Sequence, residues 1–177
     1  MKETEIKFPV KNLQSIRDRL EKEGARFETG FFEDNIVFDD QVGTLFKKRE
    51  ILRLRRSNDV VLTFKKPVEK ERFKVMEEYE VKVSDFNETY RILTGLGYKK
   101  AFRYQKRRDI FHFLGTKVLL DRTPIGDYVE IEGEKEKILE VCRHLGLSIE
   151  AGTAKNYLEL YREHCRKRDI EPGDMVF

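Results

Sequence analysis

Charges of one sign at alternate positions mark most of the strand-like segments of this chain. In "ILRLRRS", residues 51–57, Leu52 and Leu54 alternate with Arg53 and Arg55. Successive side chains of a strand point to opposite faces, so this segment forms a strand with one apolar face and one charged face. The chain must therefore fold into a sheet that buries the apolar face and finds solvent or a ligand for a face of concentrated charge.

Acids and bases are sorted onto different strand-like segments. The acidic pairs are Glu3 and Glu5, Glu78 and Glu80, and Glu130 and Glu132, and the basic segments carry Arg53 and Arg55, Lys65, and Lys106 and Arg108. For any single strand, a solvent-exposed charged face is the simpler interpretation. Solvent faces normally pair opposite charges across neighbouring strands, so the sorting as a whole favours a charged interior.

Hydrophobic periodicity and turn residues predict the order of elements along the chain. Strands are expected at residues 2–9, 28–39, 50–57, 59–66, 75–83, 99–113, 116–123 and 127–133, and helices at residues 11–24, 42–48, 85–95, 134–145 and 154–167. The charged stretch 65–74, which contains Pro67, and the tail 169–177 are expected to be irregular.

An internal repeat relates the two parts of the chain. "ETEIKF" at residues 3–8 matches "EYEVKV" at residues 78–83, and each is followed by an amphipathic helix and an aromatic-rich strand. The repeat predicts two βαβββ halves with a helical C-terminal addition, all in one domain spanning residues 1–177. The fold class is then α+β. Because two similar halves can close face to face, we expect a closed antiparallel barrel with the helices packed outside.

The overall composition excludes several classes of function. Thirty-six Lys and Arg against 33 Asp and Glu leave a formal net charge of +3, too small for the field of a nucleic-acid-binding protein. No apolar run approaches the ~18 residues of a membrane span, and the charged N-terminus lacks a signal peptide's apolar core, so we expect a cytoplasmic protein. Cys142 and Cys165 lack metal-site spacing, and the histidines form no recognisable triad. Abundant charge of both signs with few Cys and Met also predicts thermostability.

A charged interior requires a ligand with complementary charges. An isolated buried carboxylate or ammonium group would shift its pKa and become neutral. Clustered carboxylates instead bind hard cations such as Mg²⁺ or Mn²⁺, and Arg and Lys bind phosphate oxygens. A metal-bound polyphosphate satisfies both sets. Because the chain contains no G-x-x-x-x-G-K-[ST] sequence, we expect side chains to recognise the phosphates.

The order of these motifs resembles the CYTH superfamily of triphosphate tunnel metalloenzymes. The likeness spans residues 2 to about 161 and rests on Glu3-x-Glu5-x-Lys7, then "LRLR", "LTFKKP", "EEYEVKV", "YQKRRDIF", "VLLDRTPIGDYVEIEG" and "AKNYLELY". Within the superfamily the chain is most similar to class IV adenylyl cyclases of the CyaB type, with thiamine triphosphatases, inorganic tripolyphosphatases and RNA triphosphatases as relatives. The resemblance implies an eight-stranded antiparallel tunnel whose centre binds a triphosphate and a divalent metal, Mg²⁺ or Mn²⁺.

Matched position by position, the resemblance also implies roles for individual residues. The metal ligands would be Glu3, Glu5, Glu130 and Glu132, with Asp121 and Glu80 as weaker matches. The catalytic and phosphate-binding bases would be Lys7, Arg53, Arg55, Lys106 and Arg108, with Lys65 also binding substrate and Lys155 closing the mouth from the C-terminal helix. Arg56, Lys66 and Arg107 have the opposite strand parity, so they should point outward and serve as controls.

Three activities are compatible with these residues. In the cyclase interpretation, which we favour because residues 31–56 resemble that branch, the ribose 3′-hydroxyl of ATP attacks the α-phosphate and pyrophosphate leaves. In the hydrolase interpretation, water attacks the terminal phosphate of thiamine triphosphate or tripolyphosphate. A noncatalytic polyphosphate- or nucleotide-binding module is the third, although an anion binder gains little from three acidic strands. Exposed strand surfaces of this fold could also pair two copies into a homodimer.

Overall fold

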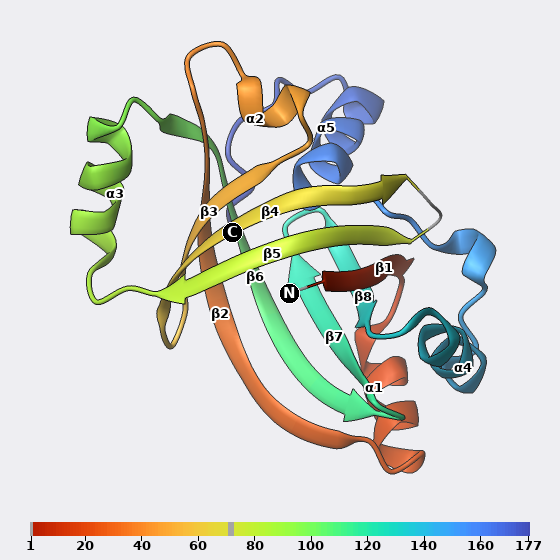
Figure 1. Ribbon diagram of the computed structural model, residues 1–177. Coiled ribbons are helices and arrows are strands. Elements are labelled where there is room, and N and C mark those ends of the chain that lie inside the picture. The colour runs from red at the N-terminus through yellow and green to blue at the C-terminus, as the bar shows by residue number, and fades with distance from the viewer. Residues whose placement is uncertain (1, 71–72) are drawn as a thin grey trace.

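Eight strands, each antiparallel to its neighbours, form a ring in the computed structural model, which describes residues 2–70 and 73–177 and the side chains of residues 4–68 and 73–177 (Figure 1). The strands are β1 (Lys2–Val10), β2 (Arg26–Asp39), β3 (Ile51–Arg56), β4 (Val60–Lys70), β5 (Lys74–Lys82), β6 (Lys99–Phe113), β7 (Thr116–Thr123) and β8 (Gly126–Glu132). Because β1 pairs with both β5 and β8, the order around the ring is β1-β5-β4-β3-β2-β6-β7-β8.

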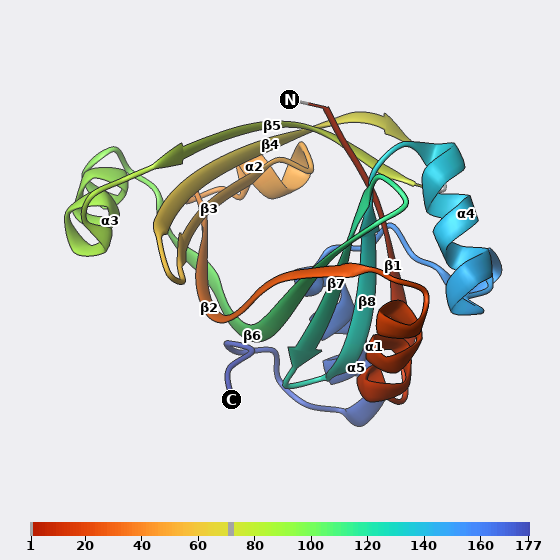
Figure 2. The same ribbon diagram turned by 90° about the horizontal axis from the view of Figure 1, so that it is seen from below.

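Five α-helices lie around this ring in the described part of the chain. They are α1 (Leu13–Lys22), α2 (Thr44–Lys47), α3 (Phe86–Gly95), α4 (Lys135–Leu145) and α5 (Tyr157–Arg168), and a 3₁₀ turn spans Ile149–Ala151. Figures 1 and 2 show α1 and α4 on one side of the ring and α3 on the other, with α2 and α5 near the end drawn at the top of Figure 1. None of these described helices is long and apolar enough to cross a membrane.

The element order confirms the predicted α+β fold and its internal repeat. The first half runs β1-α1-β2-β3-β4, with the short α2 inserted before β3, and the second half runs β5-α3-β6-β7-β8. The first strands of the two halves are neighbours, with Glu3 opposite Met76 and Glu5 opposite Lys74. The repeat therefore places the two related acidic segments side by side in the ring.

The outer apolar faces of the strands form cores under the helices. Phe8 of β1 and Ile131 of β8 pack against Leu20, Ile138 and Leu145 of α1 and α4, and each of these five side chains is at most 1% exposed. Burying an apolar side chain of this size stabilises the fold by roughly 1.5–3 kcal/mol. The charged face of β1 and β8 is therefore turned toward the inside of the ring.

On the other side, α3 covers β3 and leaves the outer face of β5 uncovered. Leu54 of β3 is buried against Phe86 and Leu93 of α3. The outward side chains of β5, Tyr79 and Val81, are 52% and 54% exposed. The helices pack outside the ring, as predicted, but they leave the apolar face of β5 exposed.

Strand β4 continues further than expected. Residues 65–70 belong to β4, which passes through Pro67, and its pairing with β5 shifts register between Pro67 and Glu69. Proline has no amide hydrogen and is tolerated in a strand at such an irregularity. The predicted irregular stretch is therefore wrong over residues 67–70 and at Lys74, where β5 begins, and residues 71–72 within it lie outside the described part.

The C-terminal tail is irregular, as predicted, but residues 174–177 are hydrogen-bonded to β6. The Met175 amide donates to the Arg103 carbonyl at 2.9 Å, and the Met175 carbonyl accepts from the Gln105 amide at 2.9 Å. Strand β7 pairs with β6 only from Arg107 onward, so the tail occupies the place next to the earlier part of β6. Met175 is only 1% exposed and packs with Phe102 and Tyr104, so the tail is part of the core on this side of β6.

Candidate functional site

A cavity of about 1400 Å³ lies inside the ring and is lined by side chains from all eight strands and from the start of α5. Among the described residues its lining contains nine Lys and Arg side chains and seven glutamates. The formal charge of this lining is therefore only +2 with His112 neutral, although its charge density is high. The predicted charged interior is confirmed.

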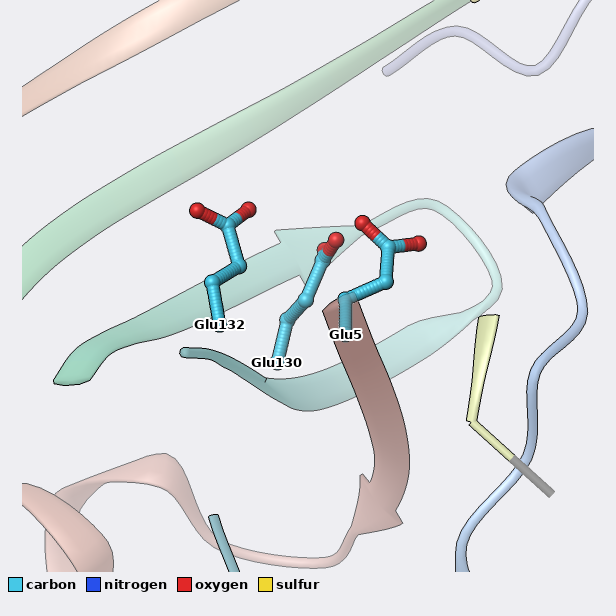
Figure 3. Close-up of side chains that lie close together, drawn as sticks. All are labelled: Glu5, Glu130 and Glu132. Carbon is cyan, nitrogen blue, oxygen red and sulfur yellow. The ribbon is translucent and has the colours of Figure 1, made fainter. Parts of the chain in front are cut away.

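Three glutamates form the acidic part of the lining. Glu5 of β1 and Glu130 and Glu132 of β8 each offer a carboxylate oxygen, and these atoms lie within 4.8 Å of one another (Figure 3). The register of the two strands explains this, because Glu5 is opposite Glu132 and Lys7 is opposite Glu130. Oxygen atoms at this spacing form a possible ligand set for a divalent cation. Glu3 belongs to β1, but its side chain lies outside the described residues.

Two lysines offset the repulsion within this cluster. Lys7 Nζ lies 3.0 Å from a Glu130 oxygen and 3.8 Å from a Glu5 oxygen, and Lys74 Nζ lies 2.6 Å from Glu5. Burial alone would raise the pKa of Glu130, but Lys7 and Arg108 outweigh it and hold the pKa well below its usual value. Burial alone would likewise lower the pKa of Lys7, yet Glu130 and Glu5 raise it. Lys7 and Glu130 are therefore both charged at neutral pH.

Asp121 anchors the bases of β6 from behind the cavity wall. Its carboxylate accepts both hydrogen bonds of a bidentate contact with Arg108 at 2.6 Å, and one from Lys106 Nζ at 3.0 Å. Arg108 also donates to Glu130 at 2.8 Å. Asp121 is fully buried and lies outside the carboxylate cluster. The structure therefore places it with the bases rather than with the three glutamates.

The bases of β3 and β4 line another part of the cavity wall, separated from β1 by strand β5 in the order of the ring. Arg53 donates to the Tyr104 hydroxyl at 3.3 Å, and Arg55 lies 3.9 Å from Glu80. Lys65 pairs with Glu78 at 3.2 Å. Glu80 lines the cavity, but it is not part of the cluster of three carboxylates.

The start of α5 contributes Tyr157 rather than Lys155. The helix begins at Tyr157 because Asn156 caps it, with reciprocal hydrogen bonds between Asn156 and Glu159. Lys155 thus precedes the helix, and its exposed ammonium group pairs with Glu163. The expectation that Lys155 closes the cavity mouth from the helix is not supported by this placement.

Tyr157 is the side chain of α5 that lines the cavity. Its side chain is buried, its hydroxyl donates to Asp121 at 2.5 Å, and its ring lies 4.9 Å from Lys7 Nζ and 5.0 Å from Lys106 Nζ. Burial and the adjacent Asp121 raise the pKa of this phenol well above its usual value, so it remains a donor. The sequence signal was present as the N-x-x-E capping box at residues 156–159.

Glu33 and Asn35 of β2 also face the interior and were not predicted. Glu33 is fully buried, and Lys106 Nζ and Arg55 lie 3.5 and 3.7 Å from its oxygens. Burial would raise its pKa, but Lys106, Arg108 and the β3 arginines lower it to about 2. Asn35 donates to Glu33 at 3.2 Å. Strand parity did not single them out, because Glu33 and Asp34 are adjacent acids of opposite parity.

The wall formed by β2 and β3 contains buried polar atoms without hydrogen-bond partners. Among the described side chains these atoms are Glu33 Oε1, Asn35 Oδ1, Arg53 Nε and Arg55 Nε. The register pairs Asn35 with Arg55, so acceptors and donors lie on adjacent strands. Leaving a buried polar atom unpaired costs about 1–3 kcal/mol. The wall is therefore suited to a polar ligand that both accepts and donates hydrogen bonds.

Arg56, Lys66 and Arg107 lie outside the cavity lining, as their parity predicts. Arg56 is exposed and packs over Phe86, with its guanidinium carbon 4.2 Å from the ring centre. Arg107 is exposed, and Lys66 lies between the outer rings of Phe64 and Tyr79. Each therefore provides a matched control for the inward base next to it in the sequence.

Comparisons with known proteins agree with this arrangement. A protein of Methanocaldococcus jannaschii named "Putative adenylate cyclase" is 28% identical over 172 residues, which cover 90% of this chain and 98% of that protein. The solved structure of a conserved hypothetical protein from Pyrococcus furiosus is 29% identical with a TM-score of 0.79, over 89% of this chain and 99% of that one.

A solved structure from Hippeastrum shows the same fold at lower identity. It is described as a "Putative adenylyl cyclase" that "reveals a dominant" triphosphatase activity, and it is 17% identical with a TM-score of 0.65, over 91% of this chain and 95% of that one. The family model described as "CYTH domain" matches residues 1–144, which is most of the chain. With the strand ring and the two-half repeat, this match establishes that the chain belongs to the CYTH domain family.

Proposed function

We propose that this protein is a metal-dependent phosphoryl-transfer enzyme that binds a triphosphate inside the ring, which then acts as a tunnel-like active site. The observation that carries the proposal is the cluster of Glu5, Glu130 and Glu132 within 4.8 Å, in a cavity that also contains nine cationic side chains. Because the described lining carries only +2, a bare polyphosphate anion matches it poorly. A complex of polyphosphate with a divalent metal has both the positive and the negative groups that the cavity requires.

The three glutamates fit Mg²⁺ or Mn²⁺, because these ions prefer oxygen ligands and the low pKa of Glu130 keeps that carboxylate ionised. When bound, the metal would supply Lewis-acid stabilisation of phosphoryl oxygens. The bases supply the rest of the electrostatics. We assign phosphate binding and neutralisation of developing charge to Lys7, Arg53, Arg55, Lys106 and Arg108, and phosphate binding to Lys65.

Two reactions fit this site, and we place the cyclase first. The archaeal relative that carries the adenylate cyclase name is 28% identical over nearly its whole length, which supports attack of a ribose hydroxyl on the α-phosphate. The triphosphatase reaction is the second candidate. It is supported by the activity described for the Hippeastrum protein, and by Glu33, which lines the cavity and whose Oε1 has no hydrogen-bond partner among the described residues, so that it is suited to accept a hydrogen bond from a water molecule.

Product analysis separates these reactions. Purified protein is incubated with ATP, tripolyphosphate or thiamine triphosphate in the presence of Mg²⁺, Mn²⁺ or EDTA, and the products are separated. Cyclic AMP with pyrophosphate supports the cyclase, and orthophosphate without a cyclic product supports the triphosphatase. No turnover with any metal while tripolyphosphate still binds would reject the enzyme and leave the binding module.

A pair of variants identifies the site in the same assay. Glu132→Gln removes one carboxylate of the cluster, and we expect the metal concentration for half-maximal activity to rise at least tenfold. Glu134→Gln serves as the control, because Glu134 also lines the cavity but does not belong to the cluster of three carboxylates. An equal effect of both variants would argue against a metal held by the cluster.

A further inference from the structure

A second cavity, here called the side pocket, adjoins the main cavity. It has a volume of about 840 Å³ and lies between α2, the ends of β4 and β5, and the start of α5. Its lining shares five residues with the main cavity, which are Ile51, Lys74, Tyr104, Asn156 and Tyr157. A single ligand can therefore contact both cavities where they meet at these residues.

The side pocket differs from the main cavity in its chemistry. Its walls are largely apolar and aromatic, with Phe46 of α2, Phe102 of β6 and Leu158 of α5 among them. Five cationic residues also line it, of which four are exposed (Lys47, Lys48, Arg49 and Arg162) and the fifth, Lys74, is shared with the main cavity. The guanidinium carbon of Arg162 lies 5.6 Å from the centre of the Phe46 ring.

These two linings match the two parts of one class of molecule. The main cavity contains the cations and the carboxylate cluster that hold phosphates and a metal, whereas the side pocket combines exposed cations with apolar and aromatic walls and contains no residue of that cluster. A pocket of several hundred Å³ with apolar walls and a few polar groups is typical of a site for a flat organic group. An aromatic ring that enters it can stack on Phe46 and lie near the Arg162 guanidinium, as aromatic and cationic groups commonly do.

We propose that the side pocket binds the aromatic ring system of an organic triphosphate, while its phosphates lie in the main cavity. This inference rests on the proposed function. A nucleobase and the rings of thiamine share the required chemistry, which is a planar, largely apolar ring joined to a phosphate chain. Inorganic tripolyphosphate has no such part, so the side pocket would distinguish organic from inorganic triphosphates.

Binding measured with three ligands tests this assignment. Isothermal titration calorimetry with Mg²⁺ at a temperature too low for turnover gives the Kd of ATP, thiamine triphosphate and tripolyphosphate. Phe46→Ala removes the stacking ring, and Val68→Trp adds bulk to the lining from a position that is 47% exposed and so tolerant of substitution. Phe32→Ala is the control, because Phe32 is also a partly exposed aromatic residue and lines neither cavity.

Phe46→Ala should weaken the organic ligand about tenfold, the effect of losing one stacking contact with its buried area. Val68→Trp should weaken it by a similar factor because the added indole occupies the space that the ligand's ring needs. The ligand affected, ATP or thiamine triphosphate, identifies which ring the pocket accepts. Tripolyphosphate binding should change less than twofold, and the control should leave every Kd unchanged. Melting temperatures verify that each variant is folded.

Two results would overturn the inference. One is an unchanged Kd for both organic triphosphates in both side-pocket variants. The other is an equal loss for tripolyphosphate and the organic ligands, which would place the effect in the phosphate cavity. Both results leave the proposed function intact. If the wild-type protein binds none of the three ligands, the proposed function itself fails, and the side-pocket assignment fails with it.

Discussion

Glu33→Gln is predicted to destabilise the protein at neutral pH by an amount that follows from the surroundings of this carboxylate. Burial would raise the pKa of Glu33, but Lys106, Arg108, Arg53 and Arg55 lower it from 4.5 to about 2. One pKa unit corresponds to about 1.4 kcal/mol, so the ionised form contributes roughly 3 kcal/mol to stability. Glutamine has nearly the same shape without the charge, and it loses this contribution.

The low pKa of Glu33 predicts how the stability difference between the wild type and Glu33→Gln changes with pH. The pKa of Glu33 is lower in the folded state than in the unfolded state, so its contribution is fully present above about pH 4.5 and disappears as the pH falls toward 2. The difference in stability between the wild type and Glu33→Gln should therefore be largest at neutral pH. It should become smaller below pH 4.5.

Urea unfolding at pH 7 and at pH 3 measures this difference in free energy, and thermal unfolding at pH 7 measures the corresponding change in Tm. For a chain of this length about 1 kcal/mol corresponds to 2–4 °C, so a decrease in Tm of roughly 6–12 °C is expected at pH 7. Glu28→Gln on the same strand is the control, because Glu28 pairs with His112 at the surface, and such a pair contributes at most about 1 kcal/mol.

A ligand measurement completes the test. The four cations around Glu33 lose a carboxylate partner in the variant, so metal-free tripolyphosphate should raise its Tm by more than that of the wild type. Equal stability of the wild type and Glu33→Gln at pH 7 would refute the reasoning. So would a deficit that stays the same down to pH 2, because the lost interaction would then not be the ionised carboxylate.

Three further predictions follow from single contacts. Arg108→Ala should lower kcat/KM for the triphosphate at least 100-fold, whereas the outward control Arg107→Ala should change it less than twofold; similar losses would contradict the assigned parity. Tyr157→Phe should lower the free energy of unfolding by about 1–2 kcal/mol, because Asp121 loses one of its donors, and unchanged urea unfolding would argue against that contact. If the uncovered face of β5 forms the expected homodimer, light scattering should give a dimer for the wild type and a monomer for Val81→Glu. An unchanged mass for the variant would show that this face does not form a dimer interface.

Strand parity made much of the cavity predictable from the sequence. Arg53 and Arg55 alternate with leucines, so one decision about which face is apolar fixes both. The proximity of Glu5 to Glu132 could not be predicted in this way, because it depends on the pairing of β1 with β8, which are 127 positions apart in the chain at these residues. Periodicity along one strand contains no information about which other strand pairs with it, and only the family resemblance placed these acids together.

Glu33 was missed because β2 gives no clear parity signal. Glu33 and Asp34 are adjacent acids, and they point to opposite faces of the strand. The structure shows Glu33 buried among cations inside the ring, whereas Asp34 accepts two hydrogen bonds from Arg103 at 2.8 Å. Apolar residues follow on both faces of β2, so their alternation could not identify which acid points inward.

Two expectations from the sequence stay predictions: that residues 1–177 form a single domain, and that the protein is thermostable.

The ion pairs inside the ring suggest why metal and phosphate should bind together. Lys7 and Arg108 both contact Glu130, at 3.0 and 2.8 Å, so neither base is available to a phosphate without loss of an existing partner. A cation bound by Glu130 would satisfy that carboxylate and release both bases toward a phosphate. Arg108 would stay in position, because Asp121 holds it by a bidentate contact from behind the wall. Glu130 and Asp121 both contact Arg108, but they have different roles. Glu130 can exchange its basic partners for a metal, whereas Asp121 keeps Arg108 in place.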